Sequence, residues 1–205
     1  MWAVVMAVVA MLAAAGSSHG ASGGLGTGAK DDQPLGPGCV DADLGERELD
    51  RGDCGIDVKT LNWILSSKEF GLAAPLGPEF DTSTEKAVAS LQSVAGLERT
   101  GVVDEDTTEA LVTSMRPDTA SFYGPGFYGN ELACGGILRR TTAGVAHRTL
   151  PCGSKVAIKY RGQFIRTTVI DRGPFVDGVK WDLTSAAAEQ IGLQETTKVR
   201  SAIVR

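Results

Sequence analysis

The sequence predicts a protein of two structural domains, a small helical bundle followed by a closed β-barrel. Between residues 52 and 116 the apolar residues recur at helical spacing, whereas after Pro117 they alternate with polar residues as in half-buried strands. Glycine makes up 26 of the 205 residues, about twice its usual share, which predicts many tight turns. With 42% hydrophobic and 22% charged residues, the chain has enough apolar side chains for packed cores.

Charge divides near the same place as the apolar pattern. Residues 1–119 carry 8 Lys/Arg against 19 Asp/Glu, a formal charge of −11, and residues 120–205 carry 12 against 6, a formal charge of +6. This division argues against nucleic-acid binding, but the C-terminal part can attract a carboxylate-rich polymer or complement the acidic part of its own chain. The sequence has no nucleotide-binding loop, metal-ligand cluster or coiled coil that would call for another class of partner, so we expect no cofactor and no metal. We also expect a monomer.

The N-terminus has the pattern of a secretory signal peptide over residues 1–21. Ala3 to Ala15 is an unbroken apolar run, followed by the small residues of a cleavage zone, although no Lys or Arg precedes the run. The first cysteine, Cys39, lies too far after the apolar run to carry a lipid anchor, so no membrane anchor is expected after signal removal. Residues 22–51 are rich in Gly and predict a flexible linker. We therefore expect an exported protein, extracellular or associated with the cell wall.

The chain has four cysteines: Cys39, Cys54, Cys134 and Cys152. No CxxC pair occurs, so a zinc site is poorly supported. In an exported protein an even number predicts two disulfides, and pairing Cys39 with Cys54 and Cys134 with Cys152 keeps each bridge within one region. Each bridge would stabilise the fold by about 3 kcal/mol in the chain-entropy model. The alternative is a nucleophilic pair of Cys152 with His147.

Three helices are expected between residues 52 and 116. The first follows Asp57 as its N-cap, the second has capping-box spacing at Thr82 and Glu85 and stops at Gly96, and the third starts near Asp106. Their apolar faces are Val58, Leu61 and Leu65 in the first, Ala87, Val88, Leu91 and Val94 in the second, and Ala110, Leu111 and Met115 in the third. Three such short helices make a small bundle.

The C-terminal part has three segments with the residue pattern of β-strands. The strands expected from alternation or from β-branched residues cover residues 156–160, 165–170 and 197–204. One helix interrupts them, with Thr184 as its N-cap and Gly192 as its stop. Short strands, glycine turns and a single helix in about 85 residues favour a closed barrel over a parallel sheet.

The helical part resembles the peptidoglycan-binding domain attached to many bacterial wall enzymes. The resemblance covers residues 52–116 and rests on GIDVKTL at residues 55–61, FDTSTEKAV at 80–88, and the landmarks L91-Q, G96-L, G101-V-V and T107 to L111. It implies a three-helix bundle that holds wall glycan or stem peptide. Most of these residues specify the fold, so we nominate no binding residue in this domain.

The barrel part, residues 119–205, resembles the RlpA-like double-psi β-barrel. Four motifs in the family's order carry the resemblance: SFYGPGFYGNELACGG at residues 121–136, AHRTLPCG at 146–153, VIDRGPFV at 169–176 and WDLTSAAA at 181–188. It implies a six-stranded barrel of the kind shared by expansins, barwin-type proteins and some lytic transglycosylases. Because this barrel serves both cutting and non-cutting proteins, the fold alone does not decide the chemistry.

Cleaving a glycosidic bond requires an acid that protonates the leaving oxygen. The resemblance implies a catalytic Glu, His and Asp, of which the last two fall on His147 and Asp171, whereas the Glu position falls on Gly136. We expect Asp171 to take the acid's role, together with Asp182, which matches an aspartate of expansin-like barrels. The structural alternative stays open, in which Asp171 forms only an Asx turn and Asp182 only stabilises the start of a helix.

Four further residues are expected to bind substrate. Aromatic faces stack on sugar rings, so Tyr123 and Trp181 are the candidates among the aromatic residues near the motifs. Arg148 and Arg172 adjoin the two motifs and are expected to bind stem-peptide carboxylates. The leading prediction is an exported protein that binds peptidoglycan glycan strands and stem peptides and cuts the glycan as a lytic transglycosylase. An expansin-like protein that loosens or binds the wall without cutting is the alternative, and a barwin-like partner-binding barrel is a third.

Overall fold

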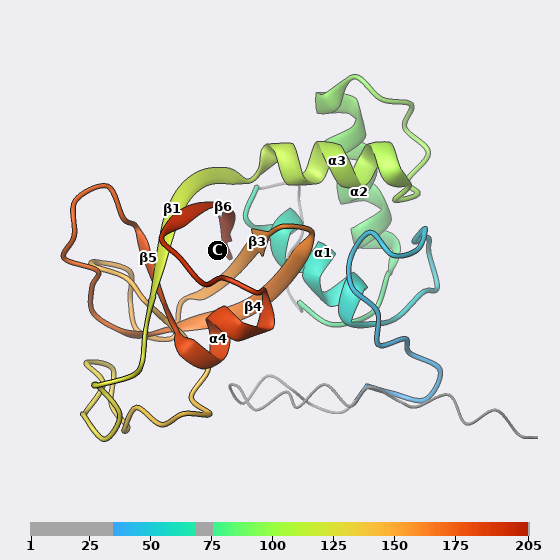
Figure 1. The fold of residues 1–205 in the computed structure, drawn as a ribbon. Coiled ribbons are helices and arrows are strands. Elements are labelled where there is room, and N and C mark those ends of the chain that lie inside the picture. Colours follow the sequence, from blue (N-terminus) through green and yellow to red (C-terminus); the bar gives the residue numbers. More distant parts are fainter. Residues whose placement is uncertain (1–34, 69–75, 205) are drawn as a thin grey trace, which may run out of the picture.

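The computed structural model describes residues 35–68 and 76–204 and shows a three-helix bundle beside a closed six-stranded barrel (Figure 1). The predicted fold class is therefore confirmed. The signal peptide expected at residues 1–21 lies outside the described residues. Of the helices in the described ranges, none has the length and apolar content that crossing a membrane requires.

The bundle consists of α1 (Ile56–Ser66), α2 (Thr82–Ala95) and α3 (Glu105–Ser114). Helix α2 begins after Asp81, whose carboxylate accepts hydrogen bonds from the backbone N–H groups of Ser83 and Thr84, and it ends at Gly96 in the left-handed conformation. Helix α1 begins after Gly55, so the prediction of Asp57 as its N-cap is wrong by two residues. Asp57 is instead buried in the first turn, where its carboxylate pairs with Arg47 at 2.7 Å.

The end of the predicted linker is part of the bundle. Leu44 and Leu49 are buried in the core that the helices share, and Leu49 exchanges backbone hydrogen bonds with Val103. The disulfide between Cys39 and Cys54 ties the same segment to the start of α1. Of the segment predicted as a flexible linker, residues 39–51 are therefore fixed, because their apolar side chains complete the core of a bundle whose helices are too short to close it alone.

The barrel strands are β1 (Arg116–Tyr123), β2 (Val145–Ala146), β3 (Lys155–Tyr160), β4 (Gln163–Asp171), β5 (Trp181–Thr184) and β6 (Thr197–Ile203). They close in the order β1-β5-β2-β4-β3-β6, with β1–β5 and β2–β4 parallel and the other pairs antiparallel. Helix α4 (Ser185–Gln190) follows β5 after Thr184, whose hydroxyl accepts from Ala187 as the predicted N-cap.

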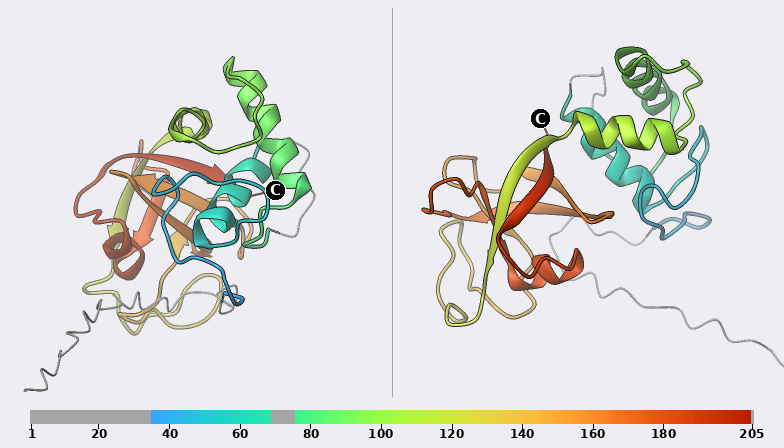
Figure 2. Two further views of the ribbon diagram at one scale, coloured as in Figure 1. Left: turned by 90° about the vertical axis from the view of Figure 1, so that its right-hand side faces the viewer. Right: turned by 45° about the horizontal axis from the view of Figure 1, so that its top comes forward.

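Alternation along the strands divides inward from outward side chains. The inward residues form one buried cluster that fills the barrel, including Val145, Val169 and Leu183 from three neighbouring strands. Outward residues of β3 and β6 form part of the other core, beneath α1. The bundle thus packs directly on one side of the barrel, as two further views show (Figure 2).

Candidate functional site

Four outward positions lie in one row across β1, β5, β2 and β4. Ser121 pairs with Asp182, and Ala146 of the two-residue strand β2 pairs with Asp182 on one side and with Asp171 on the other. Neighbouring strands lie about 4.8 Å apart, so the two aspartates, one strand removed from each other, are about 10 Å apart at their Cα atoms. The structure therefore brings Asp171 and Asp182 to the same surface.

An irregularity in β4 orients Asp171. Val145 pairs with Val169 but Ala146 pairs with Asp171, so β4 contains one extra residue, Ile170, at this point. Such a bulge changes the face on which the following side chains lie. Without it Asp171 would follow Val169 into the barrel interior, because residues two apart share a face.

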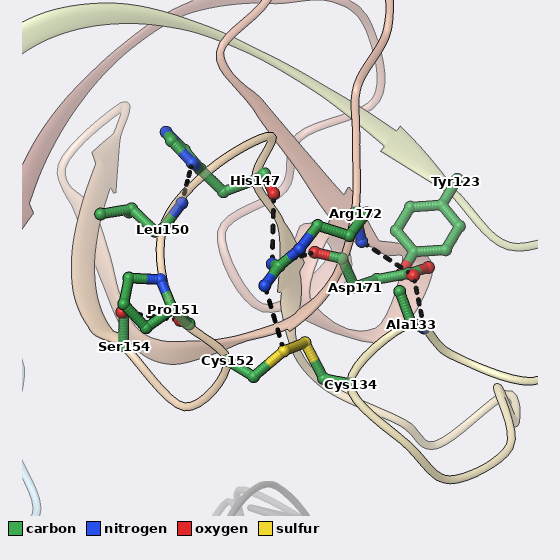
Figure 3. The surroundings of a disulfide bond; sticks show 10 residues. All are labelled: Tyr123, Ala133, Cys134, His147, Leu150, Pro151, Cys152, Ser154, Asp171 and Arg172. Carbon is green, nitrogen blue, oxygen red and sulfur yellow. Dashed lines mark hydrogen bonds between the residues drawn. A yellow bond between two sulfur atoms is a disulfide. The ribbon is translucent and has the colours of Figure 1, made fainter.

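Asp171 is held by three donors from three segments (Figure 3). Its Oδ1 accepts from the backbone N–H groups of Ala133 and Arg172, both at 2.9 Å, and its Oδ2 accepts from the Tyr123 hydroxyl at 3.2 Å. A carboxylate with bonds in three directions has little rotational freedom. The bond to Arg172 joins neighbouring residues, whereas the expected Asx turn would join the carboxylate to the N–H two residues on, so this bond does not make that turn.

Asp182 is half-buried, and its Oδ1 accepts a hydrogen bond of 2.7 Å from the Ser121 hydroxyl. Burial raises the pKa of the Asp182 carboxyl; the hydrogen bond from Ser121 opposes this rise and the charge of Asp171 adds to it. A carboxyl with a raised pKa stays protonated to higher pH and can serve as a proton donor. These surroundings make Asp182 a better candidate proton donor than Asp171, for which the acid's role was expected.

Tyr123 joins the aspartates to an exposed aromatic ring. Burial raises the pKa of the Tyr123 hydroxyl, and the charge of Asp171 and the hydrogen bond to it add to the rise, so the hydroxyl is a donor throughout the neutral range. The Phe127 ring lies edge-on to the Tyr123 ring with centroids 6.3 Å apart, and Phe127 is 54% exposed. Phe127 thus offers an open aromatic face near the aspartates.

The side chain of His147 does not join the acidic pair. Its Nδ1 accepts hydrogen bonds from the backbone N–H groups of Thr149 and Leu150, and its ring points away from Asp171 (Figure 3). Strand β2 ends at Ala146, which lies in the row of the aspartates, and His147, the next residue, is directed to the other face. Burial lowers the pKa of His147, and the charges of Lys180 and Arg172 lower it further, so the ring is neutral at pH 7.

The expected role of Trp181 in stacking on sugar needs correction. The side chain is fully buried, its ring lies 4.8 Å from the His147 ring, and its Nε1–H donates to Asp118. Trp181 is the inward neighbour of Asp182 and therefore points into the barrel. The same alternation that presents Asp182 outward leaves Trp181 without an open ring face.

The two arginines expected to bind carboxylates are engaged with the backbone. Arg148 donates to the carbonyl oxygens of Pro174 and Val176, and Arg172 donates to those of His147 and Asp171 and lies 3.3 Å from the Cys152 Sγ. Arg148 also borders a shallow depression of about 370 Å³, which is lined by His147, Arg148, Thr149, Gly178, Val179 and Lys180. That lining contains neither aspartate, so the depression is distinct from the acidic row.

Both disulfides pair as predicted, Cys39 with Cys54 and Cys134 with Cys152, which excludes Cys152 as a free nucleophile. The second bridge belongs to the site. Cys134 follows Ala133, whose N–H donates to Asp171 (Figure 3). The Cys134 N–H donates to the carbonyl of Ile170. The disulfide therefore fixes a turn that supplies one of the three donors to Asp171.

Gly136 is the residue onto which the family resemblance would place a catalytic Glu. Its φ of +88° lies in the left-handed region, and a Cβ placed there would meet no atom within 4 Å. Space is therefore available for a side chain, but the backbone conformation disfavours one. The turn is built without a carboxylate at this position.

Two groups that contact the aspartates carry no motif in the sequence. Ser121 lies two residues before Tyr123 on a strand and therefore shares its face, so alternation along β1 is the signal that marks it. The N–H of Ala133 is a backbone group that meets Asp171 across 38 residues of chain, and no side-chain pattern marks it.

Comparison with known proteins agrees with both halves of this structure. Residues 119–203 match the family described as lytic transglycolase, and residues 55–111 match the putative peptidoglycan-binding domain. The chain joins a peptidoglycan-binding domain to an RlpA-like double-psi β-barrel. The acidic row thus lies on the outer face of the RlpA-like barrel.

Two curated relatives show the extent of the likeness. The endolytic peptidoglycan transglycosylase RlpA of Campylobacter jejuni is 36% identical over 157 residues, covering 67% of this chain and 57% of the relative. The probable endolytic peptidoglycan transglycosylase RlpA of Synechocystis is 37% identical over 89 residues, covering 42% of this chain and 28% of the relative. The matches thus span between about a quarter and three fifths of these relatives.

Among solved structures, the Streptomyces papain inhibitor is 25% identical, with a TM-score of 0.37, and the match covers 46% of this chain and 97% of the inhibitor. This likeness is distant.

Proposed function

We propose that the protein is exported to the bacterial cell wall, binds peptidoglycan through the helical domain, and cleaves the glycan in the row of Ser121, Asp182 and Asp171 as a lytic transglycosylase. The observation that carries the proposal is the pair of aspartates on one outward face, of which Asp182 has a raised pKa. The relatives named for endolytic transglycosylase activity support the reaction class.

The proposed reaction needs one proton donor and one fixed negative charge. Protonated Asp182 gives its proton to the glycosidic oxygen as the bond from that oxygen to C1 breaks, and the Asp171 carboxylate stabilises the positive charge that develops on the sugar ring. The 6-hydroxyl of the same muramic residue then bonds to C1, and its proton returns to the Asp182 carboxylate. The product is a 1,6-anhydro end, and no water is consumed.

The contacts of each aspartate fit its role. Three hydrogen bonds hold the Asp171 carboxylate at a fixed place, so its charge requires no reorganisation as the transition state forms. The Asp182 carboxylate accepts one hydrogen bond, from Ser121, and the charge of Asp171 favours its protonated form. Two carboxyl groups with different surroundings can thus take different roles on one surface.

The substrate surface we propose includes Tyr123 and the exposed ring of Phe127. Phe127 takes the stacking role that was expected of Trp181, because the Phe127 ring is exposed and the Trp181 ring is buried. Arg148 is exposed, so its remaining N–H groups are available for a stem-peptide carboxylate beside the shallow depression, and we propose this contact. Arg172 and His147 are assigned positioning roles, since they hold the loops around Asp171.

Export is supported by the two disulfides, since such bonds persist in oxidising compartments, and by the apolar leader of the sequence. Periplasmic or extracellular fractions should contain the protein with its first residues removed.

The products of sacculus digestion test the proposed reaction. Purified protein is incubated with sacculi in water enriched in ¹⁸O, and the soluble fragments are analysed by mass spectrometry. We expect fragments with 1,6-anhydro ends and no ¹⁸O at the new ends. Reducing ends that contain ¹⁸O would show a hydrolase instead, and the absence of any fragments, with binding intact, would show a protein that does not cut.

A second candidate function is wall loosening or wall binding without cleavage, as in expansins. Gly136 favours it, because the family's catalytic Glu is replaced by a glycine in the left-handed conformation. Gly136→Glu separates the two candidates. If Asp182 is the acid, this variant changes cleavage little, and the strained backbone costs about 1–3 kcal/mol of stability; cleavage that appears only in the variant would favour the non-cutting candidate for the natural chain.

A further inference from the structure

The disulfide between Cys134 and Cys152, here called the barrel bridge, is accessible from solution. Cys152 is exposed and Cys134 is half-buried. The bridge joins the segment between β1 and β2 to the turn between β2 and β3, so neither cysteine belongs to a strand or helix. A thiolate from solution can therefore attack this bond while the barrel stays folded.

Arg172 places a positive charge on one sulfur of the barrel bridge. Its Nη2 donates to the Cys152 Sγ at 3.3 Å, while its Nη1 donates to the carbonyl oxygens of His147 and Asp171 and so holds the guanidinium in place (Figure 3). A nearby positive charge stabilises a thiolate and makes that sulfur the better leaving group in thiol–disulfide exchange. Cys152 is therefore the sulfur that leaves, and Cys134 is the sulfur that is attacked.

The disulfide between Cys39 and Cys54, here called the bundle bridge, has different surroundings. Both of its cysteines are half-buried, and Asp53 directly precedes Cys54. The guanidinium of Arg47, which lies beside the Cys54 carbonyl, pairs with the carboxylates of Asp53 and Asp57, so two negative charges balance its positive charge. An attacking thiolate is repelled by such carboxylates, so we expect the barrel bridge to open first.

The barrel bridge restrains a segment that is bonded mainly to itself. Within residues 127–138, the N–H of Leu132 donates to the carbonyl of Gly136, and similar bonds join other residues of the segment. By contrast, the N–H of Ala133 donates to Asp171 at 2.9 Å and the N–H of Cys134 donates to Ile170 at 3.2 Å, both in β4. These two bonds to β4 come from a bridged cysteine and its neighbour, so opening the bridge removes the covalent restraint on both.

We propose that the barrel bridge is a thiol-exchange site, at which a dithiol opens the disulfide and releases the segment that supplies the Ala133 N–H to Asp171. The effect on cleavage rests on the proposed function, because it requires Asp171 to act on glycan. The thiol chemistry and the release of the segment do not depend on that function.

The exchange proceeds in two balanced steps. A thiolate of the dithiol bonds to the Cys134 Sγ as the S–S bond breaks, and the electron pair of that bond stays on Cys152 as a thiolate beside Arg172. The second thiolate of the dithiol then attacks the dithiol's own sulfur in the mixed disulfide and expels Cys134 as a thiolate. The dithiol loses two electrons and two protons and becomes a disulfide; the two cysteines gain the electrons, and the protons pass to them or to water.

Opening the barrel bridge should lower the rate of cleavage. Asp171 then keeps the donors from Tyr123 and Arg172, but without the Ala133 N–H its carboxylate is free to rotate. Misplacing a fixed group by about 1 Å can cost about 10²-fold in rate, so we expect a loss of about 10-fold or more. Reoxidation of the bridge should restore the rate.

The experiment follows both bridges in one sample. The oxidised protein is treated with dithiothreitol without denaturant, portions are alkylated at intervals, and mass spectrometry gives the open fraction of each bridge. We expect the barrel bridge to open at least about 10-fold faster than the bundle bridge. As it opens, amide hydrogen exchange in residues 127–138 should accelerate, and fragment release from sacculi should fall in proportion to the open fraction.

A monothiol shows which sulfur is attacked. With glutathione, the mixed disulfide should form on Cys134 and leave Cys152 to be alkylated. Arg172→Gln removes the guanidinium from the sulfur, so the mixed disulfide should divide between the two cysteines and opening should slow about 10-fold. Arg148→Gln is the matched control and should keep the wild-type site and rate, because Arg148 donates to backbone carbonyls rather than to a sulfur.

Each contrary result has a definite meaning. A bundle bridge that opens as fast as the barrel bridge, or a mixed disulfide found mainly on Cys152, would overturn the thiol-exchange site. Unchanged amide exchange in residues 127–138 after opening would overturn the release of the segment, and unchanged fragment release would overturn its effect on Asp171. If even the oxidised protein released no fragments, the proposed function would fail, while the mapping and the amide exchange would still decide this inference.

Discussion

At the scale of single residues, the site depends on how two chemically identical side chains are given different surroundings. Asp171 accepts three hydrogen bonds, whereas Asp182 is half-buried beside one hydroxyl and has a raised pKa. The difference arises from strand register and from one bulge rather than from a special residue type. It predicts how the pH dependence of cleavage responds to single substitutions.

Cleavage should fall as pH rises through the pKa of Asp182, because the acid must be protonated. Ser121→Ala removes the hydrogen bond that lowers this pKa, so the descending limb of the pH profile should move to higher pH. Asp171→Asn removes the charge that raises it, so the limb should move to lower pH, with a lower maximum rate. The measurement is the rate of fragment release from sacculi across pH.

If the descending limb of the pH profile lies at the same pH in the wild type, Ser121→Ala and Asp171→Asn, Asp182 is not the titrating acid. Phe127→Leu serves as the control in the same assay, since it removes an aromatic face without touching either aspartate. It should weaken substrate binding and leave the shape of the pH profile unchanged.

At the scale of elements, the segment between β1 and β2 contributes the Ala133 N–H that donates to Asp171, and the Cys134–Cys152 disulfide fixes this segment. Removing this bridge with Cys134→Ser and Cys152→Ser should free Ala133 from Asp171 and lower the cleavage rate of the folded protein. Each bridge closes a similar length of chain, with separations of 15 and 18 residues, so both should stabilise the fold by about 3 kcal/mol.

The Cys39–Cys54 bridge is the matched control for that prediction. Its removal with Cys39→Ser and Cys54→Ser should cost a similar free energy of unfolding but leave the cleavage rate per folded molecule unchanged. Equal rates in the two double variants, measured well below both melting temperatures, would contradict a positioning role for Cys134–Cys152.

The N-cap of α2 should show a pH dependence of stability. Hydrogen bonds from the Ser83 hydroxyl and the Thr84 N–H lower the pKa of Asp81, so its contribution is complete above the ordinary Asp pKa and is lost as pH falls through the lowered value. Asp81→Ala should cost about 1 kcal/mol of the free energy of unfolding at neutral pH. Denaturant unfolding should show this cost shrinking in acid; a constant cost would contradict the account.

The sequence predicts elements well where the signal is local. Gly96 ends its helix and Thr184 begins one as expected, and the alternating residues of β3 and β6 form strands. Alternation did not reveal β2 and β5, which contain two and four residues, because so few residues cannot show a period. These strands were expected only through the family resemblance.

Sequence motifs marked Asp171, Asp182 and Tyr123 of the candidate site, but they did not mark Ser121 and did not show how these side chains are oriented. Asp171 and Asp182 meet because barrel closure places β4 and β5 on either side of β2, which no local pattern encodes. The inward positions of Trp181 and the outward position of Ser121 follow from alternation once the strands are known. The direction of His147 follows in the same way from its place after Ala146 on β2.

At the scale of the whole molecule, the bundle and barrel form one cooperative unit. Because the two share a core around Ala157 and Ala202, the wild-type chain should unfold in a single calorimetric transition. Ala157→Glu places a charge in that core and should split the transition in two. Gln163→Glu, at the exposed start of β4, is the control and should leave a single transition. Two transitions in the wild type would contradict a fixed arrangement.

The central claim is that Asp182 is the acid that cuts glycan on the outer face of the barrel. The most direct measurement compares the wild type with Asp182→Asn for two quantities on the same sacculi, the amount of protein bound and the yield of anhydro-ended fragments. We expect equal binding and a loss of about 10²–10⁴-fold in fragment release, the usual contribution of a general acid. An unchanged yield from Asp182→Asn would contradict it.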